Sequence, residues 1–198
     1  MSGDETDDPS REIMEATYRA LCEHGYAATS ISKIADEFAK SKSLLYYHYE
    51  DKEDLLEDFL GFLLDEFETE VATIEEKEPA ERLAAVLDLL VPSDLDDEEM
   101  HFRRAVLEIR AQAPYHETYR EQIERSDELI LGEIIDAIER GIDSGAFRPV
   151  NARQVAEFIY STAYGAIERG VTLEDPTVIE EGREAIDDYV DSQVRSYA

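Results

Sequence analysis

Apolar residues recur along nearly the whole chain at the spacing of one helix face, and this pattern limits the fold more than any other feature. Ile31, Ile34, Ala35 and Phe38 are an example, because their spacing places all of them on one side of a helix. We find no alternating apolar segment flanked by hairpin turns, which a strand would require. The sequence therefore predicts an all-α protein of about nine helices.

Capping residues and glycine divide this pattern into helices. Gly25 suits the end of a first helix, while Ser30 and Ser41 are placed to cap two short helices joined by a turn at residues 38–40. Asp51 is placed to cap the long helix that follows. Three helices with such a turn between the last two form a helix-turn-helix arrangement. We expect a disordered acidic tail at residues 1–8, a helix-turn-helix domain at 9–51 and a second helical domain at 52–198.

Lysine is concentrated in one short stretch of a very acidic chain. The sequence has 49 acidic and 19 basic residues, which gives a formal net charge of −30. Of its five lysines, four lie in or beside the helix-turn-helix: Lys33, Lys40, Lys42 and Lys52. In molar salt the Debye length is about 3 Å, so the self-repulsion of such a chain is screened. The composition therefore indicates a protein of a high-salt cytoplasm, and an ordinary acidic protein is the alternative explanation.

The second short helix has side chains that suit a DNA groove. Recognition in the major groove needs a short exposed helix with donors and small residues in its first turns, where Lys42 and Ser43 stand. Ser41 offers both its hydroxyl and a helix N-terminus to a phosphate. The aromatic rings of residues 46–48 can lie along the sugar-phosphate backbone and bond phosphate oxygens with their polar tips. This pattern predicts DNA binding.

The same stretch resembles a known family. From residue 25 it reads Gly-Tyr-x-x-Thr-Ser-Ile-x-x-Ile-Ala, and from residue 41 Ser-Lys-x-Leu-Leu-Tyr-Tyr-His-Tyr-x-x-Lys-x-x-Leu-Leu. These motifs are similar to the N-terminal domain of TetR-family transcriptional regulators. The turn departs from the family pattern, since Phe38-Ala39-Lys40 replaces the usual Ala-Gly-Val. Alanine in place of glycine indicates a turn that avoids positive φ or tolerates some strain.

The resemblance implies a sequence-specific, ligand-responsive repressor that binds a palindromic double-stranded DNA operator as a homodimer. It places Lys42, Ser43 and Tyr47 nearest the bases. The residues that it implies for the DNA backbone are Thr29, Ser30, Tyr46, His48 and Lys52. The full set of expected DNA contacts is Thr29, Ser30, Lys33, Lys40, Ser41, Lys42, Ser43, Leu44, Tyr46, Tyr47, His48 and Lys52.

The last two predicted helices, of which the final one is expected over residues 177–197, carry apolar faces that suit pairing. Ser161 and Gly165 allow close approach. TetR-like proteins pair these helices with their copies in a four-helix bundle, so the resemblance implies a homodimer. Packing within one chain is the alternative explanation of the same faces. The expected interface consists of Val155, Phe158, Ile159, Thr162, Ala166, Ile186, Tyr189, Val190 and Val194.

Aromatic residues outside the helix-turn-helix are candidates for an effector pocket. The resemblance implies a pocket enclosed by the middle helices of the 52–198 domain. Phenylalanine and tyrosine there would suit a small apolar or aromatic ligand, although plain core packing explains each residue equally well. The candidates are Phe59, Phe62, Phe102, Tyr160 and Tyr164.

Residues for catalysis or metal binding are sparse. The four histidines form no HxxxH or HExxH pair, and Cys22 is the single cysteine. The acidic residues within 94–99 could hold a divalent cation, but a solvated loop explains them better. We expect no enzyme activity, no cofactor and no metal site.

No apolar run in the sequence approaches the roughly 18 residues that a membrane span needs. We therefore expect a cytoplasmic protein without a membrane partner. The alternative to a DNA reader is an acidic protein-interaction module that retains the helix-turn-helix head. Replacing Lys42 and Tyr47 separates the two hypotheses, because only the DNA reader depends on these side chains.

Overall fold

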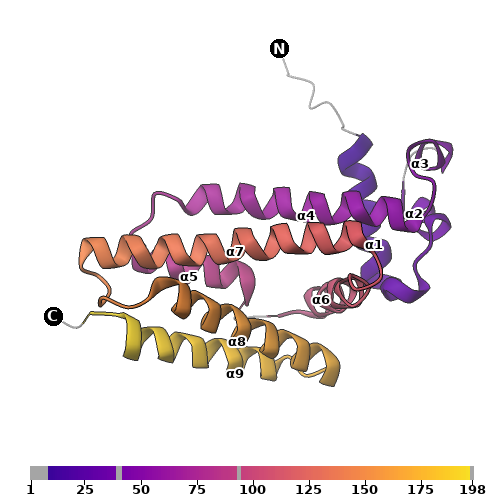
Figure 1. Ribbon diagram of the computed structural model, residues 1–198. Coiled ribbons are helices and arrows are strands. Elements are labelled where there is room, and N and C mark those ends of the chain that lie inside the picture. Colours follow the sequence, from indigo (N-terminus) through magenta and orange to yellow (C-terminus); the bar gives the residue numbers. More distant parts are fainter. Residues whose placement is uncertain (1–8, 39–41, 93–94, 197–198) are drawn as a thin grey trace, which may run out of the picture. The chain divides into compact units, whose positions relative to one another are not determined.

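The computed structural model describes residues 9–38, 42–92 and 95–196, and of Lys42 only the backbone (Figure 1). The regular elements among these residues are nine α-helices and one π-helical turn, which confirms the predicted all-α fold. The chain divides into two compact units. Unit 1 comprises Met1–Leu63 and Asp97–Ile123, and unit 2 comprises Leu64–Asp96 and Glu124–Ala198.

Unit 1 is a helical head that is discontinuous in sequence. Its core includes Leu45, Phe59 and Tyr119, whose side chains are fully buried. Ala105 and Ile109 complete the same core, so a segment far along the chain packs with the N-terminal helices. The sequence-based domain limits at 9–51 and 52–198 stay a prediction. The helices of unit 1 are α1 (Pro9–Ala28), α2 (Ile31–Glu37), α3 (Lys42–His48), the first part of α4 (Lys52–Ile74), α6 (Asp97–Arg110) and the start of α7 (Glu117–Ser144).

Local side-chain caps explain where several helices begin. The Ser30 hydroxyl accepts a hydrogen bond from the Lys33 N–H at 3.4 Å at the start of α2. Asp51 accepts from the Asp54 N–H at 3.0 Å at the start of α4. Such caps satisfy N–H groups that have no partner within the first helical turn. The caps predicted at both positions are confirmed.

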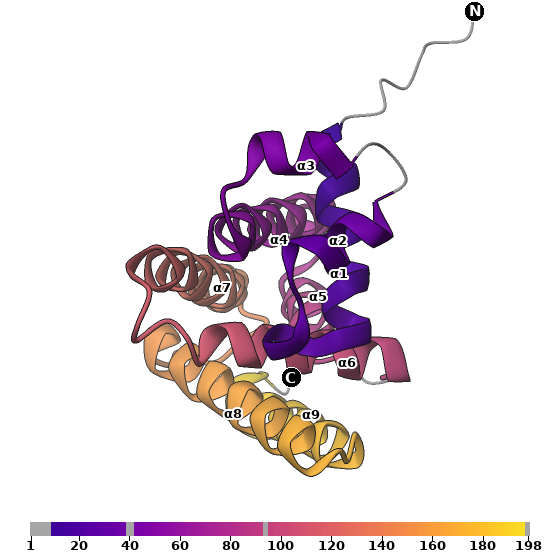
Figure 2. The same cartoon turned by 90° about the vertical axis from the view of Figure 1, so that its right-hand side faces the viewer.

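Unit 2 contains the rest of α4 and α7 and pairs α8 with α9, which lie side by side in both ribbon views (Figures 1 and 2). A Cβ added at Gly182 of α9 would lie 2.3 Å from the Ala166 Cβ of α8, so this contact requires glycine. The Arg183 side chain is buried and donates to the Val91 carbonyl at 2.8 Å. The elements specific to unit 2 are α5 (Pro79–Leu90), α8 (Ala152–Leu173), α9 (Thr177–Tyr189) and the π-helical turn η1 (Val190–Val194).

The C-terminal helix differs from the sequence prediction of a single helix to residue 197. Regular α-helix ends at Tyr189 and a π-helical turn follows. The chain is then held in an extended bridge, in which Arg148 N–H donates to the Val194 carbonyl at 2.8 Å and Ser196 N–H to the Ala146 carbonyl at 3.0 Å. These partners lie far back in the sequence, so no local pattern near residue 190 announces the change.

Candidate nucleic-acid interface

Helix α3 presents one buried side and one open side. Leu45 is fully buried in the core of unit 1. On the other side, 54 % of Tyr46 and 83 % of Tyr47 is exposed, and Ser43 is exposed as well. Two neighbouring exposed rings on one helix form an apolar patch, and exposed patches often mark a site of interaction. The open side of α3 is therefore the candidate interface.

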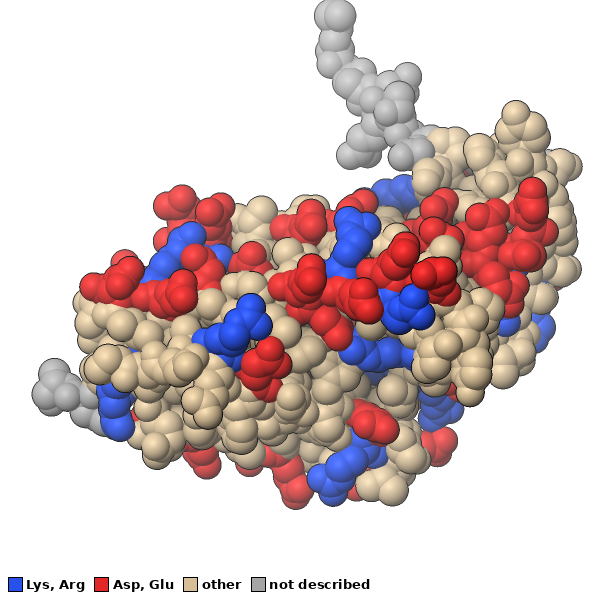
Figure 3. All heavy atoms as spheres, viewed as in Figure 1, with Lys and Arg blue, Asp and Glu red and all other residues tan. Residues whose placement is uncertain are grey.

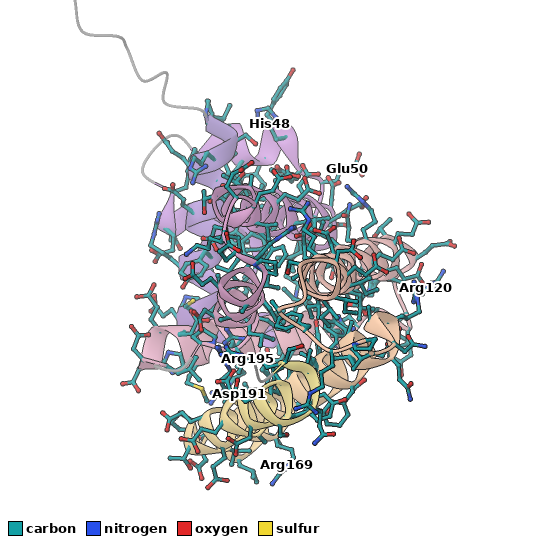
Figure 4. All side chains as sticks on the ribbon, turned by 90° about the vertical axis from the view of Figure 1, so that its left-hand side faces the viewer. His48, Glu50, Arg120, Arg169, Asp191 and Arg195 are labelled. Carbon is teal, nitrogen blue, oxygen red and sulfur yellow. The ribbon has the colours of Figure 1, made fainter. Side chains whose placement is uncertain are left out.

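Other predicted contacts lie around this helix. Ser30 and His48 are exposed, while Lys33 and Leu44 are half-buried. The His48 ring packs edge-on against Tyr47, with 5.4 Å between the ring centroids. Figure 4 shows His48 and Glu50 where α3 gives way to the start of α4. Lys40, Ser41 and the centre of the predicted turn lie outside the described residues, as does the side chain of Lys42.

Two predicted DNA contacts instead have partners inside unit 1. Thr29 is buried, and its hydroxyl is 2.6 Å from the Gly25 carbonyl and 3.2 Å from the Ala20 carbonyl. The Lys52 ammonium donates to the Tyr26 carbonyl at 3.1 Å and lies 3.9 Å from the centroid of the Tyr26 ring. Both side chains hold the junction between α1 and α2.

Carboxylates border the open side of α3. Glu50, Asp54 and Glu57 contribute to a groove of about 500 Å³ that Tyr46 and Tyr47 also line. Beneath it, the Tyr49 hydroxyl donates to Asp58 at 3.0 Å, and burial followed by the charge of Asp58 raises the pKa of Tyr49 well above its usual value. Among the side chains that Figure 3 colours, acidic ones border the α3 end. DNA at α3 would therefore approach negative charge on the protein.

The candidate pocket aromatics fall into two groups. In unit 1, Phe59 is fully buried, and Phe62 and Phe102 pack against the same core. In unit 2, the buried Tyr160 donates to Asp127 at 2.6 Å, and its ring centroid lies 4.8 Å from that of Tyr164. Burial, followed by the neighbouring Tyr164, raises the pKa of Tyr160 well above its ordinary value. The first group therefore belongs to unit 1 and the second to unit 2.

The candidate pairing residues of unit 2 differ in exposure. Phe158 stands out because 46 % of it is exposed, with its ring centroid 4.4 Å from that of Tyr189. A Cβ added at Gly165 would meet no atom within 4 Å, so this glycine leaves open surface on α8. Thr162 is half-buried. The remaining candidates already pack inside the chain: Val155, Ile159, Ala166, Ile186, Val190 and Val194.

Sequence reasoning missed two carboxylates that the fold brings to these regions. Glu108 bonds the backbone of Tyr26 from 82 residues away, and Asp127 bonds Tyr160 from 33 residues away. Neither contact has a local signal, since acidic residues are common along the whole chain. Within the described part of the chain, we find no cluster of His, Cys, Asp or Glu that could hold a metal ion. No described helix is long and apolar enough to cross a membrane.

Two family profiles match the sequence in succession. Residues 13–59 match the profile described as bacterial regulatory proteins of the tetR family. Residues 79–195 match the profile described as the C-terminal region of BetI-type transcriptional repressors. The first match covers most of α1, all of α2 and α3 and the beginning of α4, and the second begins at α5.

Individual proteins show the same similarity. The structure of a TetR transcription regulator from Haloarcula marismortui is 38 % identical, with a TM-score of 0.86 over 95 % of this chain and 99 % of that one. A transcriptional regulator from Saccharomonospora viridis, solved in complex with choline, is 21 % identical, with a TM-score of 0.81 over 97 % of this chain and 100 % of that one. The repressor AcnR of Corynebacterium glutamicum is 32 % identical over 54 residues, which are 27 % of this chain and 29 % of AcnR.

Proposed function

The chain belongs to the TetR family of transcriptional regulators, and we propose that it is a repressor that binds a palindromic operator as a homodimer and releases it when a small effector binds. The observation that carries this proposal is α3, which buries Leu45 and leaves Tyr47 83 % exposed. A short helix fixed in this way has the size and the free donors that the major groove accepts.

We assign the exposed residues of the head to DNA in two groups. Lys42, Ser43 and Tyr47 lie nearest the bases, and Ser30, Tyr46 and His48 hold the backbone. Lys33, Lys40, Ser41 and Leu44 complete the proposed interface. For Thr29 and Lys52 we propose a different part, because their polar atoms bond Gly25 and Tyr26. They hold the junction between α1 and α2 that supports α3, and the Lys52 ammonium has further N–H donors for a phosphate.

We propose that α8 and α9 pair with the same helices of a second chain. Half-exposed Phe158 supplies an aromatic anchor, and Gly165 supplies open surface for close approach. In a two-fold dimer, the helix-turn-helix of each chain faces one half of a palindrome. The buried apolar residues of these helices support that surface from inside the chain.

We propose that the head works in the high salt of the cytoplasm. With a net charge of −30 and carboxylates beside α3, the protein repels DNA in dilute salt. At about 1 M salt the Debye length falls to about 3 Å, so this repulsion is confined to contacting groups. The same salt weakens phosphate binding, so base contacts and packing supply more of the affinity.

We propose that the effector is recognised in unit 2 by Tyr160, Tyr164 and Asp127. Two tyrosine rings beside a carboxylate suit a small organic cation, through ring faces and charge together. The choline complex of the Saccharomonospora viridis regulator supports this choice. A neutral apolar or aromatic effector, which the sequence alone favours, is the competing possibility and would use the rings only.

Choline is expected to weaken operator binding about tenfold, a usual size for coupling between two sites. The measurement is the operator dissociation constant in choline chloride and in KCl of equal concentration. Tyr164→Ala should remove the response and leave binding without choline unchanged. An equal effect of the two salts on the wild type contradicts a choline-like effector.

The proposed function is tested by selecting genomic DNA fragments with the purified protein in about 1 M KCl, a salt at which non-specific phosphate binding is weak. Footprinting of the selected fragment should reveal a protected site with two-fold symmetry. Selection of no fragment above the background of unrelated DNA would overturn the proposal.

A further inference from the structure

Helix α1 contains a break at Gly25, and the backbone beyond it is held by α6. Gly25 has φ of 70° and ψ of 170°, a conformation that interrupts the helix and favours glycine. The N–H of the next residue, Tyr26, donates to Glu108 Oε2 at 2.6 Å. A Cβ added at Gly25 would lie 3.2 Å from the same oxygen, so the glycine also allows this close approach.

Tyr26 is held from its other side by the first residue of α4. The Lys52 ammonium donates to the Tyr26 carbonyl at 3.1 Å and lies over its ring. Tyr26 of α1 is thereby hydrogen-bonded to a carboxylate of α6 and to an ammonium of α4. A charged partner makes each of these hydrogen bonds stronger than a bond between neutral groups.

The same junction sets the start of α2. The Gly25 carbonyl accepts from the Thr29 hydroxyl at 2.6 Å and from the Thr29 N–H at 3.1 Å. Ser30, the cap of α2, follows directly in the chain. The helix before α3 and the helix after it are therefore both tied to residues 25–26. A change at this junction alters both ends of the segment that carries α3.

We infer that Glu108 is a positioning residue for DNA reading, which uses its bond to the Tyr26 N–H to fix the angle at which α3 is presented. This inference rests on the proposed function. Glu108 lies on α6, whose first residue, Asp97, directly follows the unit 2 segment that ends at Asp96. A displacement of α6 reaches α2 and α4 through this bond.

Glu108 also lines a groove of about 700 Å³ between α1 and α6, together with Glu98, His24 and His101. Glu98 belongs to the same helix and is exposed, but the Tyr26 N–H bond is made by Glu108. Glu98→Ala is therefore a matched control, since it removes one carboxylate from the same groove and helix.

The test measures operator affinity and its salt dependence for Glu108→Ala, Glu108→Gln and Glu98→Ala. We expect Glu108→Ala to weaken operator binding about tenfold with the same fraction of active protein, because the Tyr26 N–H loses the charged acceptor that ties it to α6. The slope of log affinity against log KCl concentration should stay that of the wild type, since no phosphate contact is lost. Glu108→Gln keeps an acceptor oxygen and should stay within about threefold, with Glu98→Ala equal to the wild type.

Amide hydrogen exchange distinguishes the loss of this one bond from a general loss of stability. The Tyr26 N–H should exchange faster in Glu108→Ala than in Glu98→Ala, while core amides of α4 stay protected in both. If Glu108→Ala does not fold, Glu108→Asp takes its place, because its shorter side chain no longer reaches the N–H. A folded Glu108→Ala or Glu108→Asp that binds operator like the wild type overturns the inference. A wild type that binds no operator overturns the proposed function instead.

Discussion

Replacing Lys42 and Tyr47 together with alanine is expected to lower operator affinity roughly 100-fold and to leave the fold intact. Each good contact to a base is worth about 1–3 kcal/mol, so the loss of two costs about 2–6 kcal/mol, a range that includes the roughly 2.8 kcal/mol of a 100-fold change. Tyr47 is 83 % exposed, and exposed positions usually change the free energy of unfolding by no more than about 0.5 kcal/mol. Operator titration and thermal unfolding of the variant measure the two effects.

A matched control exists elsewhere in the chain. Lys77 is exposed and Tyr115 is 82 % exposed, so Lys77→Ala with Tyr115→Ala makes the same chemical change outside α3. This control should bind operator like the wild type. If the α3 variant also binds normally, or if regulation in the cell survives it, the protein acts as an acidic interaction module and not as a DNA reader.

Replacing Phe158 with glutamate is expected to convert the proposed dimer into a monomer and to lower operator affinity more than about 100-fold. A central aromatic anchor contributes about 2 kcal/mol or more to an interface, and a two-fold axis sets the new carboxylate near its own copy. A monomer holds only one half-site and loses the high effective concentration of the second head. Sedimentation and operator titration measure both losses.

The control for this change is Tyr115→Glu, which adds the same charge at an exposed aromatic residue of unit 1. It should remain dimeric and bind operator as the wild type does. A Phe158→Glu variant that stays dimeric would place the pairing surface elsewhere. In that case Gly165 and α8 lose their proposed part.

The sequence predicted the helices well because their signals are local. Ser30 and Asp51 cap the helices that they were expected to cap, through bonds to N–H groups three residues ahead. The end of α9 was missed, because its change to a π-helical turn accompanies bonds from Ser196 to Ala146 and from Arg148 to Val194. Contacts that span about fifty residues leave no trace in a helical pattern.

At the candidate site, too, local features were predicted and contacts between distant residues were not. The exposed tyrosines of α3 follow from a short helix whose apolar side is Leu45, and they are open as expected. Thr29 and Lys52 have internal partners, Gly25 and Tyr26. Tyr26 is 26 residues from Lys52, and only the folded head brings the two close. Glu108 was not predicted, because its carboxylate is one of 49 acidic side chains until α6 packs on α1.

The central claim is that this acidic chain reads a specific DNA sequence in concentrated salt. The measurement that tests it most directly is fluorescence anisotropy of a selected palindromic fragment and of a shuffled fragment of equal length, in KCl up to about 1 M, where phosphate attraction is weakest. We predict that two chains bind the palindrome at the highest salt, and that the shuffled fragment stays free. Equal binding of the two fragments at every salt concentration would contradict the claim.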